Sequence, residues 1–154
     1  MRDKRFVAEH RGGPLTMDRH RLLMKWACDC ARHILPLVGK KPDARLENAL
    51  RVAGLWRRGR ASVGQAREAS VAAIAAANES PDPVAAAVAR AVGHAVATAH
   101  MADHALGPAL YALKALKIAG KPVDTERKWQ EDHLPPEIKD LVLTTPKYKY
   151  IERI

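Results

Sequence analysis

The sequence predicts an all-α protein: a single compact multi-helix domain of about five main helices followed by short C-terminal helices. Alanine is very frequent between Ala61 and Ala119, and alanine loses the least on entering a helix. Apolar residues elsewhere recur every three or four positions, the spacing that places them on one helix face. The 154 residues match the usual size of one domain and can bury a core without disulfides or a structural metal.

Breaks in this pattern divide the chain into three parts. A Gly-Gly-Pro run at residues 12–14 interrupts regular structure, so residues 1–16 are expected to form an N-terminal arm that can still dock on the domain. The helical domain is expected over residues 17–145. Residues 146–154 are expected to form a polar C-terminal tail.

Apolar stripes predict the first two helices. The first runs from Met17 to about Leu35, where Pro36 ends it, and its stripe is formed by Leu22, Leu23, Trp26, Ala27, Cys30, Ala31 and Ile34. The second is expected to open with Pro42 as its first helical residue, because proline is preorganised for that position, and to continue to Gly59.

Capping residues mark the third and fourth helices. Ser62, followed three residues later by Gln65, fits a capping box, in which each side chain satisfies a free backbone donor at the helix start. Asp82 is placed to cap a long fourth helix, and Pro83 to open it. We expect this helix to reach roughly His100.

The fifth helix is predicted after a break near residue 101. Asp103 can start it, Gly120 ends it, and its expected apolar stripe is Leu106, Leu110, Leu113 and Ile118. Pro108 fits either a first turn or a kink, so the sequence leaves open whether the helices over residues 83–119 are separate or one kinked rod. Gly93, within the fourth helix, is expected to let another helix approach closely.

Two short helices are predicted near the C-terminus. Asp124 is expected to cap one that runs through Trp129. The Pro135-Pro136 pair is expected to open another over residues 138–143.

Cysteine usage and hydropathy predict a soluble, cytoplasmic protein. Cys28 and Cys30 are too close in sequence to staple distant segments, which indicates a reducing compartment. The charged N-terminus leads into no apolar segment typical of a secretion signal. The most apolar stretch, Val84 to Leu106, is interrupted by polar residues, so no membrane association is expected.

The net charge of +9 lies essentially in the first 60 residues, which predicts a regional basic surface and an acidic partner, either nucleic acid or protein. Arginine can grip phosphate or carboxylate with two parallel hydrogen bonds. The densest basic cluster consists of Arg51, Arg57, Arg58 and Arg60, with Lys40, Lys41 and Arg45. The first four are the candidate partner-binding residues. The alternative is a solvated helix end, where the helix dipole favours cations without any partner.

Histidines offer a weak candidate metal site. His100 and His104 are four residues apart and can share one helix face, with Asp103 as a possible oxygen ligand. The glutamate of a zinc-protease helix is missing between them, and the alternative is two helix-end histidines that bond to the backbone or to an acid, or that pack against Tyr111. Cys30 and His33 are a second pair with a spacing that suits metal ligands, but two ligands do not complete a tetrahedral site.

Catalytic motifs are not found in the sequence. There is no glycine-rich phosphate loop, no nucleophile elbow and no paired Cys-x-x-Cys. Neither an enzyme nor a cofactor is therefore expected, although a composite active site assembled from distant residues would not be visible at this level.

One pattern runs through these helices, with a tryptophan, two histidines and a tyrosine at set places in an alanine-rich background. It consists of Leu23-Met24-Lys25-Trp26-Ala27-Cys28-Asp29-Cys30-Ala31, then Asp43-Ala44-Arg45 with Ala49 and Trp56, then Gly93-His94-Ala95-Val96-Ala97-Thr98-Ala99-His100, and then Tyr111-Ala112-Leu113-Lys114-Ala115. From about Leu22 to Ala119, the chain resembles the alanine-rich helical type of bacterial immunity proteins of polymorphic-toxin systems.

The resemblance implies a small helical intracellular protein, without catalysis of its own, that binds a cognate protein toxin and blocks it. Immunity proteins against nucleases are often acidic, whereas this chain is basic, so nucleic-acid mimicry is not implied. An interface of this kind should combine steering charges with a buried anchor.

Other interpretations stay open beside this one. A basic helical nucleic-acid-binding module would use the same arginines on phosphates. A metal-binding helical protein would use the histidine pair. Exposed alanine faces also allow a homodimer. Whether His94, His100, His104 and Tyr111 pack or bind is a question for the structure.

Overall fold

A computed structural model describes residues 2–154, and the predicted all-α fold is confirmed across them. The helices are α1 Met17–Ile34, α2 Ala44–Arg57, α3 Val63–Glu79, α4 Pro83–Ala97, α5 Leu106–Ile118, α6 Asp124–Asp132, α7 Pro136–Thr144 and α8 Tyr148–Glu152. Two short 3₁₀ turns, η1 Lys4–Phe6 and η2 Glu9–Arg11, precede α1, and two others, η3 Leu35–Val38 and η4 Ala102–Ala105, join α1 to α2 and α4 to α5. Residues 2–154 contain no strand, only an isolated bridge between Ala8 and Leu15.

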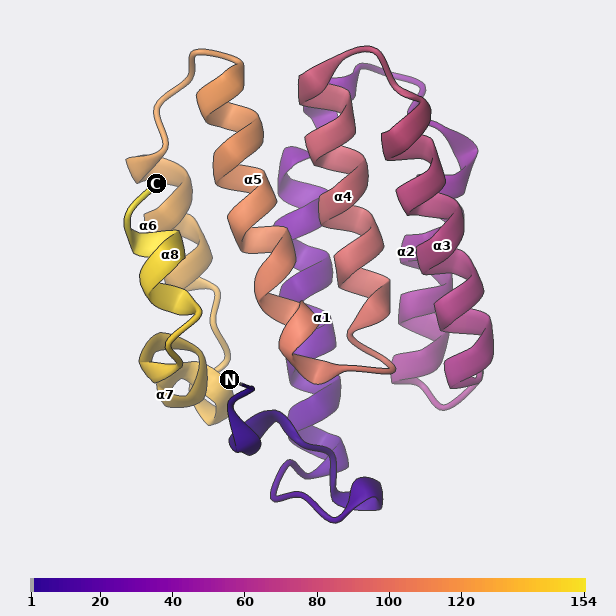
Figure 1. The fold of residues 1–154 in the computed structure, drawn as a ribbon, viewed down its shortest axis with the longest axis vertical. Helices are drawn as coiled ribbons and strands as arrows, with labels where there is room; N and C mark the ends of the chain where they lie inside the picture. Colours follow the sequence, from indigo (N-terminus) through magenta and orange to yellow (C-terminus); the bar gives the residue numbers. More distant parts are fainter. Residues whose placement is uncertain (1) are drawn as a thin grey trace.

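The five long helices form two layers. In Figure 1, α3, α4 and α5 stand side by side in front, α1 and α2 lie behind them, and α6 to α8 pack beyond α5. Helix α4 is central because it contacts α1, α2, α3 and α5. Most of its residues are alanine or valine, and most of them are buried, as expected of a helix that is apolar over most of its surface.

Buried polar side chains connect the C-terminal helices to this core. Trp26 of α1 is fully buried, and its Nε1 donates to the main-chain oxygen of Gln130 in α6 at 2.9 Å. The Nε2 of Gln130 donates in turn to the main-chain oxygen of Ala109 in α5 at 3.1 Å. Because a buried polar group is costly unless it is paired, these bonds fix α6 against α1 and α5.

Local capping chemistry explains the starts of α1 to α4, each of which has a side-chain cap. The Ser62–Gln65 capping box is confirmed in both directions, and Asp82 caps α4, with Pro83 as its first residue. Pro42 does not open α2: Asp43 caps it by accepting from the main-chain N–H of Arg45 at 2.9 Å, so the helix begins two residues later.

Two other predicted helix starts differ from the structure. Asp103 lies in η4, which runs directly into α5, so no side-chain cap is needed there. Asp124 is the first helical residue of α6 and accepts from Arg127 instead of capping, and the helix continues past Trp129 to Asp132. The Pro135-Pro136 opening of α7 is confirmed.

The fourth and fifth helices are separate elements. Helix α4 ends at Ala97, the chain reverses through η4, and α5 runs back beside α4 with Pro108 in its first turn. The predicted stripe of α5 holds for Leu106 and Leu113 but is wrong for Ile118, whose side chain is 53% exposed. Ile118 follows Leu113 by five positions, which rotates it to the outer face, and Leu116 takes the inward position.

Close helix packing at Gly93 confirms the role expected of that glycine. A Cβ at this position would lie 2.6 Å from Cδ1 of Ile74 in α3, too close for any real contact. Its main-chain oxygen also accepts from the hydroxyl of Ser70 at 3.0 Å. Helices α3 and α4 therefore approach each other through the missing side chain.

Both ends of the chain dock on the helical body. Phe6 and Leu15 of the N-terminal arm are buried in the core. The segment expected as a polar tail contains α8, in which Tyr148 and Ile151 are buried, so it is more than a polar tail. The Tyr148 hydroxyl donates to Glu131 of α6 at 2.6 Å. Among residues 2–154, no helix combines the length and the apolar character needed to cross a bilayer.

Candidate functional site

Two adjoining hollows open on the side of the molecule where α3, α4, α5 and the start of α8 meet. One has a volume of about 530 Å³ and the other about 230 Å³, and both have His94 and His104 in their walls. We call this the histidine groove and define it by Arg67, Val71, Ile74, His94, His100, His104, Tyr111, Lys147 and Tyr150.

A direct contact between two imidazoles forms the ridge between the hollows. The Nδ1 atoms of His94 and His104 lie 3.1 Å apart, which is hydrogen-bond distance. One ring must therefore carry its proton on Nδ1 and the other on Nε2, because two donors or two acceptors would repel. The His94 ring also stacks on the Tyr111 ring, with ring centroids 5.3 Å apart. The ring centroids of His104 and His100 are likewise 5.3 Å apart.

Glycine at position 107 makes this arrangement possible. A Cβ there would lie 2.6 Å from both Cβ and Cγ of His94. Because Gly107 lacks that atom, the first turn of α5 can pass against the His94 ring. The ridge thus depends on one small residue in α5 facing one histidine in α4.

The histidines of the groove stay neutral near pH 7. Burial lowers the pKa of His94 and of His100 below its ordinary value. The pKa of His104 falls to about 4, chiefly because the ring is desolvated and secondarily because His94 and His100 lie nearby. The positive charge around the groove therefore comes from other residues.

Three cations lie in or beside the groove. Arg67 of α3 lies in the wall of the larger hollow and Lys147 in that of the smaller one. Lys114 of α5 places its Nζ 5.2 Å from the centre of the Tyr111 ring. These cations come from elements far apart in sequence.

Asp103 does not join the predicted metal site. It is only 4% exposed, and its Oδ2 accepts from Nζ of Lys147 at 3.1 Å and lies 3.5 Å from Nε of Arg2. Of the predicted trio, the structure brings His100 and His104 together and adds His94, while the Asp103 carboxylate is engaged by lysine. No group of three His, Cys, Asp or Glu side chains is arranged to hold a metal among residues 2–154.

The cysteines and His33 are occupied separately. Cys28 and Cys30 are buried, and desolvation raises the pKa of Cys28 to about 12 and that of Cys30 well above its ordinary value. His33 pairs with Glu126 at 2.7 Å and stacks on Trp129 with centroids 3.6 Å apart. Cys30 is therefore part of the hydrophobic core, and His33 packs α1 against α6.

The four predicted partner-binding arginines lie along α2 and the turn that follows it; we call them the arginine surface. Arg51, Arg58 and Arg60 are exposed, and Arg57 is half-buried. Arg51 donates to Asn48 at 2.8 Å. Within residues 2–154, none of the four forms an ion pair with a carboxylate, and the charges of Arg51, Arg58 and Arg60 face solvent uncompensated.

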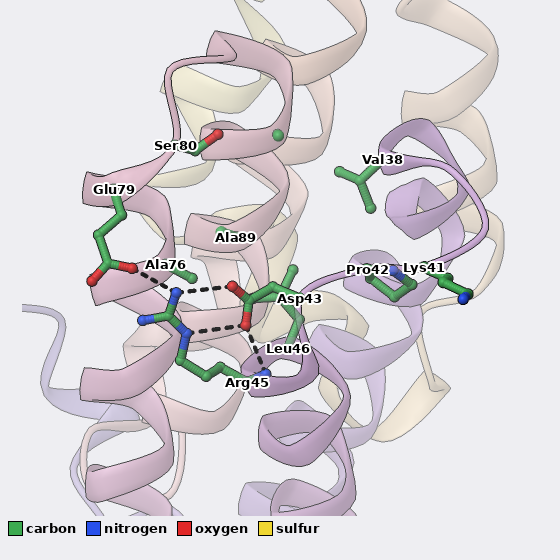
Figure 2. A pocket seen from close by; sticks show the side chains of 11 residues that line it. Val38, Lys41, Pro42, Asp43, Arg45, Leu46, Ala76, Glu79, Ser80 and Ala89 are labelled. Atoms are coloured by element: carbon green, nitrogen blue, oxygen red, sulfur yellow. Dashed lines mark hydrogen bonds and ion pairs between the residues drawn. The ribbon is translucent and has the colours of Figure 1, made fainter.

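Arg45, in contrast, is neutralised. Figure 2 shows its guanidinium held between Asp43 and Glu79, at 2.8 Å and 2.6 Å, beside a hollow of about 370 Å³. The hydrogen bonds from Arg45 lower the pKa of Asp43 to about 2. This clasp joins the start of α2 to the end of α3. Of the neighbouring cations, Lys40 and Lys41 are exposed.

The histidines and Tyr111 of the groove stand out in the sequence, but its other residues do not. Arg67, Val71, Lys147 and Tyr150 carry no motif, and only the packing of α3, α4, α5 and α8 brings them together. The sequence contains a partial signal for the groove: His94, His100 and Tyr111 all belong to the pattern that resembles the immunity proteins, and all three line the two hollows.

These features define a compact all-α protein with a hollowed, histidine-lined face and cationic margins. The family model described as "Imm-5 like putative immunity protein" matches residues 13–137, and the chain belongs to that family. The match extends from the N-terminal arm into the start of α7, so it includes most of the groove and all of the arginine surface. Neither the curated proteins nor the solved structures contain a match to this chain.

Proposed function

We propose that this protein is a non-catalytic binder that neutralises a cognate toxin by direct protein–protein contact in the bacterial cytoplasm. The observation that carries the proposal is the family match over residues 13–137, because an immunity family implies a toxin partner in general. Neutralisation by contact needs a stable folded surface and no reaction, and the well-packed helical body is suited to that role.

The arginine surface supports the proposal through its charge. Arg51, Arg58 and Arg60 are exposed without carboxylate partners, so they are free to attract an acidic face of the toxin. Such charges raise the association rate more than they slow dissociation. We therefore assign the arginine surface to steering the partner toward the protein.

Capture of the partner tests the proposal. The tagged full-length chain is expressed in its native cell, purified with and without nuclease, and the retained material is identified. We expect one protein retained in stoichiometric amount after nuclease treatment. Material that disappears with nuclease, with an affinity that falls steeply as salt rises, would instead identify a nucleic-acid-binding module.

A paired charge reversal tests the arginine surface. The variant R51E/R58E is compared with K121E/K128E, which changes the same number of charges on exposed lysines of the α5–α6 turn and α6. We expect the first variant to bind the captured protein at least about tenfold more slowly, with unchanged thermal stability. Equal association rates for the two variants would remove the arginine surface from the interface.

A further inference from the structure

We infer that the histidine groove is the anchor site of this interface and takes an acidic segment of the toxin that inserts an apolar side chain between α3 and α8. The inference rests on the proposed function, since it presupposes a protein partner. It assigns a binding role to residues outside the arginine surface.

Charge complementarity is the first support. The groove is bordered by Arg67, Lys114 and Lys147, and its histidines are neutral. The carboxylate that lines it, Asp103, is shared between Lys147 and Arg2, so this corner keeps a net positive charge. A segment that carries carboxylates would meet Arg67 in the larger hollow, Lys147 in the smaller one and Lys114 beside Tyr111.

Exposed apolar side chains at the two edges are the second support. Val71 in α3 is 65% exposed and Tyr150 in α8 is 67% exposed, although the chain buries most of its large apolar residues. Both line the hollows, and the half-buried Ile74 and Leu110 extend the apolar walls. The larger hollow, about 530 Å³, falls within the size of typical binding clefts, roughly 300–1,000 Å³.

The neutral histidine ridge fits a peptide backbone. Since His94 and His104 share one proton between their Nδ1 atoms, one ring keeps an N–H at Nε2 and the other keeps a lone pair there. A pair with one donor and one acceptor matches the N–H and C=O groups of an extended peptide. The apolar walls and neutral ridge favour a protein segment over a phosphate backbone, which needs a row of cations.

Photo-crosslinking in the native cell tests where the partner sits. A photoreactive phenylalanine analogue replaces Val71 or Tyr150, and the matched control replaces Ile118, an equally apolar residue that is 53% exposed outside the groove. We expect positions 71 and 150 to crosslink the protein captured by the wild-type chain, through an acidic peptide, and position 118 to crosslink little. Equal crosslinking at position 118, or a basic crosslinked peptide, would overturn the inference.

Charge reversal measures the contribution to affinity. The captured protein is purified and used as the probe against wild type, R67E, K114E and the control K121E, with thermal melts confirming that each variant is folded. We expect R67E and K114E to weaken binding about tenfold or more each, and K121E less than twofold. If R67E and K114E bind with unchanged affinity while R51E/R58E binds more weakly, the assignment of the groove is overturned and the proposed function is not. A wild-type chain that captures no protein would overturn the proposed function itself.

Discussion

The pKa of His104 predicts that the protein loses stability in mild acid. Folding buries this ring against His94 and His100 and lowers its pKa from the ordinary 6.5 to about 4. Between these values the unfolded chain binds a proton that the folded chain does not, so stability rises with pH across this window. The contribution is complete above pH 6.5 and is lost as the pH falls toward 4.

The size of the effect follows from this shift. Moving from pH 7 to pH 5 at a folded pKa of about 4 removes about 2 kcal/mol of the free energy of unfolding through His104. The lowered pKa values of His20 and His94 act in the same direction. Between pH 7 and pH 5 the free energy of unfolding of the wild type should therefore fall by more than about 2 kcal/mol. That of H104Q should fall by about 2 kcal/mol less than that of the wild type.

Urea unfolding at pH 7 and pH 5 measures the difference. The variant H104Q is compared with H10Q, which removes an exposed histidine from the N-terminal arm and should follow wild type. An NMR titration of the His104 ring provides the second measurement. A ring that titrates near pH 6.5, or an H104Q variant with the same pH dependence as wild type, would refute the buried ridge.

Three further substitutions test the packing that builds the site. G107A should lower the free energy of unfolding by about 1–3 kcal/mol, because the new Cβ would lie 2.6 Å from His94; an unchanged melting temperature would contradict that close approach. Y148F should cost about 1.5–3 kcal/mol through the lost bond to Glu131, and a neutral effect in urea would show that α8 does not dock as described. S62A should lower the free energy of unfolding by about 1 kcal/mol, because it removes the side-chain cap of α3. The denaturant midpoint measures this loss, and S80A is the control because the Ser80 side chain caps neither α3 nor α4.

Helix positions were predictable where the information is local. The capping box at Ser62, the proline at residue 83 and the glycine at residue 93 act on backbone groups a few residues away, and the structure confirms each. Some local predictions were still wrong: Pro42 does not open α2, which Asp43 caps, and Asp124 accepts from Arg127 instead of capping α6. Contacts across the chain carry no local signal, and the carboxylate of Asp103 pairs with Lys147, 44 residues further along the chain.

The candidate site was only partly predictable for the same reason. His100 and His104 stood out by spacing, yet the histidine that His104 contacts through nitrogen is His94, on the preceding helix. Arg67 and Tyr150 belong to no motif in the sequence. Only the packing of α3 and α8 against α4 and α5 places them at the two ends of one groove.

Growth rescue tests toxin neutralisation most directly. The protein captured by the wild-type chain is expressed in a heterologous bacterial host, alone, with the wild-type chain, and with R67E/K114E. We predict that the captured protein arrests growth, that the wild-type chain restores it, and that the groove variant restores it poorly while remaining folded. A captured protein that is harmless, or an arrest that the wild-type chain does not relieve, would contradict the account.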